Sequence, residues 1–446
     1  MDASALNWLS ATDAARAIRE GSASSEELVR ACLDQIAREE SRVQAWQFLD
    51  EAYALAQARA ADKWRRAGEP LGALHGVPVG VKDIIDTADM PTEDGTVLHA
   101  GRTPLHDAAV VRMLREAGAV ILGKTVTTEL ATYAPGKTRN PHNPEHTPGG
   151  SSSGSAAAVV AGMVPLAIGT QTNGSVIRPA AYCGAYGFKP TYGLVPRAGI
   201  LKQSPPLDQV GVFARSADDL ALGAEAIMGD DEDDPATRPR ARPPLARVAA
   251  EEPPFPPRLA FVRTPMWDAA EEETRAAFAE LAEHLGDRVA EFTLPESARA
   301  AWEWHRTIME ADLAASFEKE YDEGRDRLSD SLRGQIERGR AVAAVEYLKA
   351  AARIPRLNDG FAELFDRFDA ILTPAATGTA PHGLASTGSP VFCTLWTLCG
   401  MPAVALPLMQ GENGLPLGVQ VVGARGDDAR LLRTARWLVG AVADGG

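Results

Sequence analysis

The sequence predicts an α/β protein with a mixed, largely open β-sheet that helices cover on both faces. Short runs of β-branched residues alternate along the chain with stretches whose apolar residues recur every three or four positions, and this alternation is typical of α/β sheets. The strand-like runs lie at 77–81, 120–122 and 164–168, and the helical stretches at 25–39, 51–67, 108–117 and 155–162.

We expect a single domain over residues 1–446, because strand-like runs at 370–373, 403–407 and 415–422 indicate that the sheet resumes late in the chain. Residues 229–257 contain GDDEDD, then RPRARPP, then EEPPFPP, and the proline content and charge of this stretch argue against packed secondary structure. The expected parts are a helical N-terminal part (1–70), a catalytic core (71–228), an exposed acidic and proline-rich connector (229–258), a mostly helical insertion over the pocket (259–369) and a return to the sheet (370–446).

Bulk properties exclude several classes of function. The net charge of −15 disfavours nucleic acid or an anionic membrane surface as a partner, since both would repel the chain at long range. The first thirty residues show no signal-peptide pattern and no apolar run approaches a membrane span, so a cytoplasmic protein is expected. Four scattered cysteines and eight scattered histidines favour neither a disulfide scaffold nor a metal site. We expect no metal and no cofactor.

Two turns rich in glycine and serine are the most unusual feature of the sequence. They are TPGGSSSGS (147–155) and GTQTNGS (169–175), joined by one helix and one apolar strand. Small residues let a backbone approach a ligand and direct several N–H groups at one point, as an oxyanion or phosphate site requires. Flexible loops are an alternative that composition leaves open. A phosphate-binding loop is less favoured, because no G-x-x-x-x-G-K-[ST] or G-x-G-x-x-G pattern is present.

A nucleophilic serine in these turns would need a base. No G-x-S-x-G elbow occurs, and no histidine follows in the order that α/β-hydrolases use. A lysine can serve instead when burial lowers its pKa. Lys82 ends the apolar run HGVPVGVK, at the end of an expected strand. A surface lysine paired with Asp83 is the alternative, and the residues alone favour it.

Four segments together resemble the amidase signature family. They are GVPVGVKDIIDT (76–87), TRNPHNPEHTPGGSSSGSAAAV (138–159), GTQTNGSVIRPAAYCGAYGFKPTYG (169–193) and GLPLGVQVVG (414–423). The resemblance implies a Ser, cis-Ser, Lys triad with Lys82 as base, Ser151 as the bridging serine after a cis Gly150–Ser151 peptide, and Ser175 as the nucleophile that forms an acyl-enzyme. It also implies an oxyanion hole built from backbone N–H groups of Thr172, Asn173, Gly174 and Ser175.

The sequence around the expected nucleophile departs from the commonest family pattern. Most members have DTGGS with an arginine two places later, whereas this chain has QTNGSVIR. Gln171 replaces an acid, Arg178 is displaced by one place, and Asn173 replaces a glycine, which asparagine tolerates because it enters left-handed backbone regions readily. The contacts around the triad are therefore open at this point.

The substrate is the least determined feature. In the glutaminase subunit of tRNA-dependent amidotransferases, a branch of this family, an acid in the C-terminal part helps to hold the amino group of glutamine. The corresponding segment, SPVFCTLWTLCGMPA (389–403), has no acid. We expect a pocket that includes Tyr133, Gly150, Phe392 and Trp396 and suits an uncharged substrate, although the two large aromatic residues could equally be ordinary core.

These observations predict a stand-alone amidase that cleaves the C–N bonds of uncharged amides, including aryl amides, with esters and carbamates (urethanes) as further substrates. We expect a monomer or homodimer whose partners are small molecules only, with neither nucleic acid nor membrane. The alternative is the glutaminase (A) subunit of a tRNA-dependent amidotransferase. The acyl and leaving groups, and the preference among amide, ester and carbamate, are not determined by the sequence.

Overall fold

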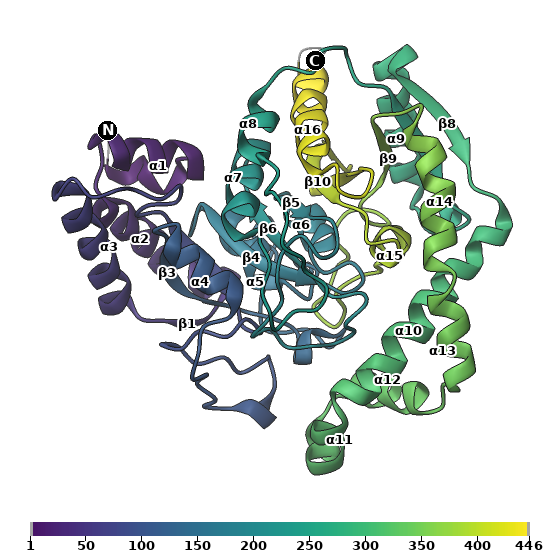
Figure 1. Cartoon of the computed structure of the whole chain (residues 1–446), viewed down its shortest axis with the longest axis horizontal. Helices are drawn as coiled ribbons and strands as arrows, with labels where there is room; N and C mark the ends of the chain where they lie inside the picture. Colours follow the sequence, from purple (N-terminus) through teal and green to yellow (C-terminus); the bar gives the residue numbers. More distant parts are fainter. Residues whose placement is uncertain (1–2, 444–446) are drawn as a thin grey trace.

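The computed structural model describes residues 3–443 and is built around one mixed β-sheet (Figure 1). Within those residues eleven strands follow the order β1-β3-β2-β4-β6-β5-β10-β11-β9-β7-β8. The strands are β1 (Trp46–Leu49), β2 (Pro78–Lys82), β3 (Val120–Thr125), β4 (Leu166–Gln171), β5 (Tyr186–Lys189), β6 (Gln209–Ala214), β7 (Leu259–Arg263), β8 (Val289–Thr293), β9 (Ala370–Pro374), β10 (Ala403–Gln410) and β11 (Pro416–Val422). Strand β2 pairs in parallel with β3 and β4, whereas β6 pairs antiparallel with β4 and β5. The predicted fold class is confirmed.

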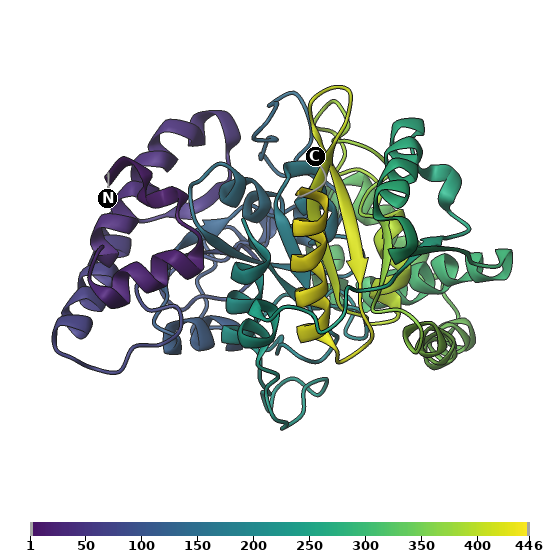
Figure 2. The same ribbon diagram turned by 90° about the horizontal axis from the view of Figure 1, so that it is seen from above.

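Helices pack on both faces of the sheet (Figures 1 and 2). In β4, the side chain of Leu166 lies against Gly223 of α7, whereas a side chain at Gly169 would meet Ser152 beside α5. Successive residues of a strand point to opposite faces, so α7 and α5 cover different faces. The helices are α1 (Ala11–Glu20), α2 (Ser25–Val43), α3 (Glu51–Arg66), α4 (Ala109–Glu116), α5 (Ser153–Val160), α6 (Ile177–Cys183), α7 (Ala217–Ile227), α8 (Leu245–Ala250), α9 (Glu272–Leu285), α10 (Ala300–Ser316), α11 (Glu318–Gly324), α12 (Asp330–Arg340), α13 (Ala344–Ala351), α14 (Ile354–Phe365), α15 (Val391–Leu398) and α16 (Asp428–Ala443).

The N-terminal helices form where the apolar spacing predicts them. A capping box starts α2: the Ser24 side chain accepts from the backbone N–H of Glu27, whose carboxylate accepts from the backbone N–H of Ser24. The apolar residues that recur along α2 are buried, including Leu28, Cys32 and Ile36. Helix α3 packs against α2 and β3, beyond the β1 edge of the sheet (Figure 1).

The stretch between β7 and β9 carries helices α10 and α12, whose residues line the cavities near Ser175. Strand β7 pairs in parallel with both β8 and β9, so this stretch extends the sheet before it becomes helical. The following helix α10 packs against α12, α13 and α15. Helices α10 to α13 project from one end of the molecule, whereas α15 lies close to the sheet (Figure 1). Most of residues 300–365 are helical, in α10 to α14.

The connector at 229–258 differs from the expectation that it lacks packed secondary structure. Residues 245–250 form α8, which packs against α7 and α16 and buries Leu245 and Ala249. The sequence LARVAA presents these two apolar residues four positions apart, on one face of a helix. Asp234 is also buried, because its carboxylate pairs with Arg197 at 2.7 Å. Proline content and charge therefore mislead about α8 and about the burial of Asp234.

No helix in the described part of the chain combines the length and the apolar character needed to cross a membrane.

Candidate active site

The sheet topology brings Lys82 and both serine-rich turns to one edge. Strands β2 and β4 run parallel in register, so their carboxyl ends lie side by side. Lys82 is the last residue of β2, and Gln171 is the last residue of β4. Ser151 precedes α5, and Ser175 follows β4 by four residues and precedes α6. The arrangement places a lysine and two serine turns at the point where ligands bind in α/β sheets.

Lys82 is fully buried and lies in contact with one of the serines. Its Nζ is 2.7 Å from the Ser151 Oγ and 2.8 Å from the Thr170 Oγ1. Burial holds the pKa of Lys82 well below its usual range, and the negative charge of Asp208 opposes this shift. A neutral amine has a lone pair as well as two N–H donors. It can therefore accept a proton from Ser151 while donating to Thr170.

The two serine-rich turns are tied to each other by hydrogen bonds. The Gly150–Ser151 peptide is cis. The next residue, Ser152, donates its backbone N–H to the Ser175 carbonyl at 3.4 Å, and its hydroxyl donates to the Thr170 carbonyl at 3.1 Å. Ser151 is buried, whereas Ser175 is 9% exposed and faces a cavity. The structure therefore brings Lys82, Ser151 and the Ser175 turn together.

The Gln171 side chain accepts hydrogen bonds from the backbone N–H groups at the start of α6. Its Oε1 accepts from the N–H of Val176 at 2.8 Å and of Ile177 at 3.0 Å, and its Nε2 donates to the Thr397 hydroxyl at 2.9 Å. Within the described residues, the N–H groups of positions 172–175 have no protein acceptor. Four adjacent donors are thus available to a ligand beside Ser175.

Asn173 is not among the described residues with positive φ, so its tolerance of left-handed backbone does not explain its presence. Its side chain makes the relevant contacts instead: Nδ2 donates to the Tyr133 hydroxyl at 3.0 Å, and Oδ1 accepts from the Thr394 hydroxyl at 2.7 Å. The Asn173 carbonyl accepts from Thr397 at 2.6 Å. Asn173 therefore ties the nucleophile turn to α15.

The displaced Arg178 holds the peptide that precedes Ser151. Its Nη2 donates to the Gly150 carbonyl at 2.7 Å and to the Thr387 hydroxyl at 3.2 Å, while Nη1 donates to the Gly388 carbonyl at 3.0 Å. The guanidinium is buried. Its fork bridges the first serine turn and the segment that leads into α15.

Ser175 faces a narrow cavity of about 20 Å³, which meets a wider one of about 430 Å³. Of the four residues expected in the pocket, Tyr133 lines both of these cavities. Phe392 and Trp396 are buried in the core, where they contact Trp267 and Phe361. The narrow part is lined by Ala131, Thr132, Tyr133, Thr172, Asn173, Ser175, Gln203, Met309, Leu313 and Gln335.

Gly150 is also absent from the lining of these cavities, since a side chain there would meet Thr128 and Thr387 instead. Among the described residues no three His, Cys, Asp or Glu side chains gather as metal ligands.

The wider cavity is lined by charged residues that the sequence analysis missed. Glu310 of α10 is buried, and its Oε1 accepts from the Arg338 Nε of α12 at 3.0 Å. His305 lies one turn earlier on α10; its Nε2 is 3.0 Å from the Thr172 carbonyl, and burial lowers its pKa to about 4. These residues lie more than 100 positions from the serine turns, and no motif links them. No spacing in the sequence suggests them, because His305 and Glu310 are five positions apart and Arg338 lies on another helix.

Similar proteins correct the functional expectation. The chain is 34% identical to the A-type subunit of glutamyl-tRNA(Gln) amidotransferase from Oleidesulfovibrio alaskensis over 96% of both chains, and 34% identical to the protein of that name in Salinispora arenicola over 98% of both. The predicted stand-alone hydrolase of uncharged amides, with small-molecule partners only, is contradicted by these relatives, which are named as subunits of a tRNA-dependent enzyme. The exclusion of amidotransferase subunits from the resemblance is contradicted in the same way.

Solved structures agree with the fold. One similar structure is described as an unexpected vestigial protein complex that reveals the evolutionary origins of an s-triazine catabolic enzyme. The chain superposes on it with a TM-score of 0.90 and 27% sequence identity, over 96% of this chain and 98% of the other. It also matches the native peptide amidase from Stenotrophomonas maltophilia, with a TM-score of 0.83, 31% identity and 96% coverage of both chains. The family model Amidase matches residues 27–432. The chain therefore belongs to the amidase family.

Proposed function

We propose that this chain is the glutamine-hydrolysing subunit of a tRNA-dependent amidotransferase and that it releases ammonia from the side-chain amide of glutamine. Similarity over nearly the whole length to proteins with that name supports the assignment. The net charge of −15 is compatible with it, because in a multi-subunit enzyme the tRNA can be bound by another chain.

The observation that carries this substrate is the Glu310–Arg338 pair in the cavity beyond Ser175. The side chain of Glu310 is 7% exposed and that of Arg338 is 58% exposed, so a ligand entering the cavity can reach both. A buried carboxylate suits the α-ammonium of glutamine, and a guanidinium suits its α-carboxylate. Met309 and Leu313 line the narrow part, which suits the two methylene groups that lead to the amide.

In the proposed reaction, the Ser175 hydroxyl attacks the amide carbon while its proton passes through Ser151 to neutral Lys82. The free N–H groups at 172–175 stabilise the oxyanion. Ser151 then returns the proton to the departing nitrogen, and ammonia leaves a γ-glutamyl ester on Ser175. Water opens this ester by the reverse relay. The Lys82–Ser151 contact and the burial of both groups support these roles.

A substrate panel tests the proposal. Ammonia release is measured with glutamine, propionamide and an anilide, for the wild type and for Glu310→Gln. We expect glutamine to be preferred and its KM to rise about 10- to 100-fold in the variant, the effect of losing a hydrogen bond to a charged group. Propionamide hydrolysis should not change. Glu303→Gln is the matched control, because it removes the same charge from an exposed position on the same helix.

The assembly is tested separately. The tagged chain, purified from its own cells, should carry partner proteins in fixed stoichiometry, and that complex should amidate glutamyl-tRNA with glutamine as nitrogen donor. A pure chain without partners that hydrolyses propionamide or anilides with a far higher kcat/KM than glutamine would refute the proposal.

A further inference from the structure

Asp208 lies beside the nucleophile turn because of the sheet register. Strands β4 and β6 pair antiparallel with Gln171 opposite Gln209, so the residue after β4 and the residue before β6 are neighbours. The half-buried Asp208 carboxylate lies 2.6 Å from the Thr172 hydroxyl oxygen, whose one proton it shares with the Gln203 Oε1, and it accepts from the backbone N–H of Gln203 at 2.9 Å and of Ser204 at 3.0 Å.

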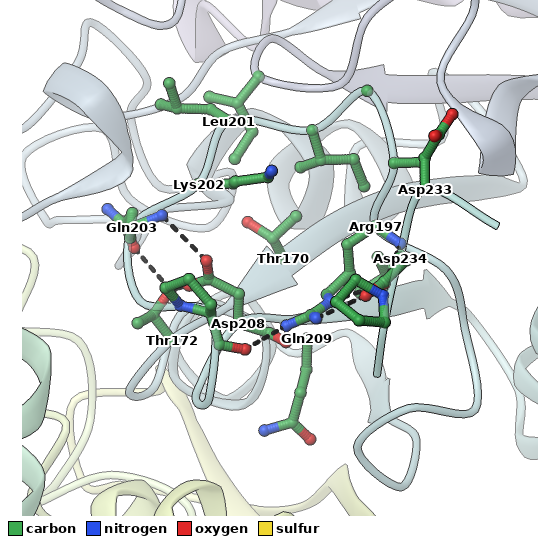
Figure 3. A pocket seen from close by; sticks show the side chains of 17 residues that line it. Thr170, Thr172, Arg197, Leu201, Lys202, Gln203, Asp208, Gln209, Asp233 and Asp234 are labelled. Carbon is green, nitrogen blue, oxygen red and sulfur yellow. Dashed lines mark hydrogen bonds and ion pairs between the residues drawn. The ribbon is translucent and has the colours of Figure 1, made fainter. Parts of the chain in front are cut away.

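A second cavity, of about 370 Å³, reaches the same carboxylate (Figure 3). Thr170, Thr172, Gln203 and Asp208 all line it. Thr172 and Gln203 also line the narrow cavity at Ser175, so these two side chains separate the two spaces. Thr170 lines this second cavity, and its hydroxyl accepts a hydrogen bond from the Lys82 Nζ. One side chain therefore separates the lysine from the second cavity.

Asp208 is the charged group that acts on Lys82. Its negative charge raises the pKa of Lys82 against the lowering effect of burial, whereas burial raises the pKa of Asp208 itself to about 6. Two other charged side chains near Lys82 have hydrogen-bond partners of their own. The Lys124 ammonium on the neighbouring strand β3 donates to the Thr92 hydroxyl, and the Asp83 carboxylate accepts from the backbone N–H of Glu93.

Arg197 lies next to Asp208 in the lining of the second cavity. Its Nη1 donates to the Asp208 backbone carbonyl at 3.0 Å and to the Pro205 carbonyl, while its Nε and Nη2 pair with Asp234 (Figure 3). The positive charge of Arg197 lowers the pKa of the Asp208 carboxyl, but the hydrogen bonds to this carboxylate come from Thr172, Gln203 and Ser204.

We propose that Asp208 is a positioning residue for amide hydrolysis: its carboxylate fixes Thr172 beside the nucleophile and stabilises the protonated Lys82 that forms when Ser175 attacks. The inference rests on the proposed relay, but not on glutamine as the substrate. As the bond from the Ser175 oxygen to the amide carbon forms, the Ser175 proton reaches Lys82 through Ser151. When the C–N bond breaks, the same proton passes to the leaving nitrogen. Asp208 gains and loses no proton in either step.

Two substitutions should shift the pH profile in opposite directions. Asp208→Asn keeps the shape of the side chain but removes its charge. The pKa of Lys82 should then fall further, and the acidic limb of the pH profile of kcat should move to lower pH. On the plateau of this profile, kcat should fall about 10- to 100-fold with KM little changed. In Thr172→Val the carboxylate keeps its charge but loses a donor that partly neutralises this charge, so it acts more strongly on Lys82 and the acidic limb moves to higher pH. The assay uses whichever amide the wild type hydrolyses.

Chemical rescue gives an independent readout. In Asp208→Ala, added formate should restore activity by at least about tenfold, because the second cavity admits a small carboxylate to the vacated position. Asp233→Asn is the matched control, since Asp233 lines the same cavity but is exposed, and it should behave as wild type. An unshifted acidic limb in both Asp208→Asn and Thr172→Val, or an Asp208→Ala enzyme that formate leaves unchanged, would overturn the proposal. A wild type that ignores glutamine but hydrolyses another amide would refute the proposed substrate alone.

Discussion

Replacing Gln171 by alanine should destabilise the protein and misplace the nucleophile together. The substitution leaves the N–H groups of Val176 and Ile177 without their acceptor, and both residues are fully buried. An unsatisfied buried N–H costs about 1–3 kcal/mol, so two of them predict a loss of about 2–6 kcal/mol in the free energy of unfolding. We expect kcat to fall as well, because these two N–H groups begin the helix directly after Ser175.

Gln171→Glu is the matched control, since a carboxylate can accept from the same two N–H groups. It loses only the donor to Thr397, and we expect a loss of about 1 kcal/mol. Urea-induced unfolding followed by circular dichroism measures both variants, with kcat for amide hydrolysis measured alongside. The reasoning would be refuted if Gln171→Ala lost less than about 1 kcal/mol, or no more than Gln171→Glu.

Three further outcomes follow from the structure. Lys82→Met should abolish hydrolysis but stabilise the fold at neutral pH. Because the pKa of Lys82 is lower in the folded protein than in the unfolded chain, burial of the lysine destabilises the wild type at every pH below its unfolded-state pKa, and this penalty disappears at high pH. The thermal unfolding midpoints of the two proteins should therefore converge as pH rises. His99 has its pKa raised to about 9 by Asp94 and Glu320, so the stability it contributes is full below about pH 6.5 and is lost as pH rises through 9; His99→Gln should lower the unfolding midpoint at pH 6 and leave it unchanged at pH 10. Arg178→Lys cannot reproduce the guanidinium fork, and kcat should fall at least about tenfold with normal far-ultraviolet dichroism.

Local patterns were sufficient to predict the sheet and most helices, whereas the family resemblance, and not the residues alone, placed Lys82 beside the serine turns. Strand and helix periodicity identified β2, β4 and α5, and parallel strands that end at one edge must deliver their last residues to one place. The short helix α8 was missed, because proline and charge around it obscure two buried apolar residues.

Contacts between distant parts of the chain could not be predicted. Asp208 reaches Thr172 only through the antiparallel register of β4 and β6, and neither strand reveals its partner in the sequence. Glu310 and Arg338 meet because α10 packs on α12. Under the proposed function the acid that meets the substrate is Glu310, which lies outside the segment 389–403. Phe392 was expected in a pocket, although α15 turns it into the core.

The most direct test of the central claim is to trap the acyl-enzyme. The protein is mixed with glutamine, quenched in acid within one turnover and digested, and the peptides are analysed by mass spectrometry. The account predicts one γ-glutamyl group on the peptide that carries Ser175, and none in Ser175→Ala. Hydrolysis of glutamine without acylation of Ser175, or with the acyl group on another residue, would contradict it.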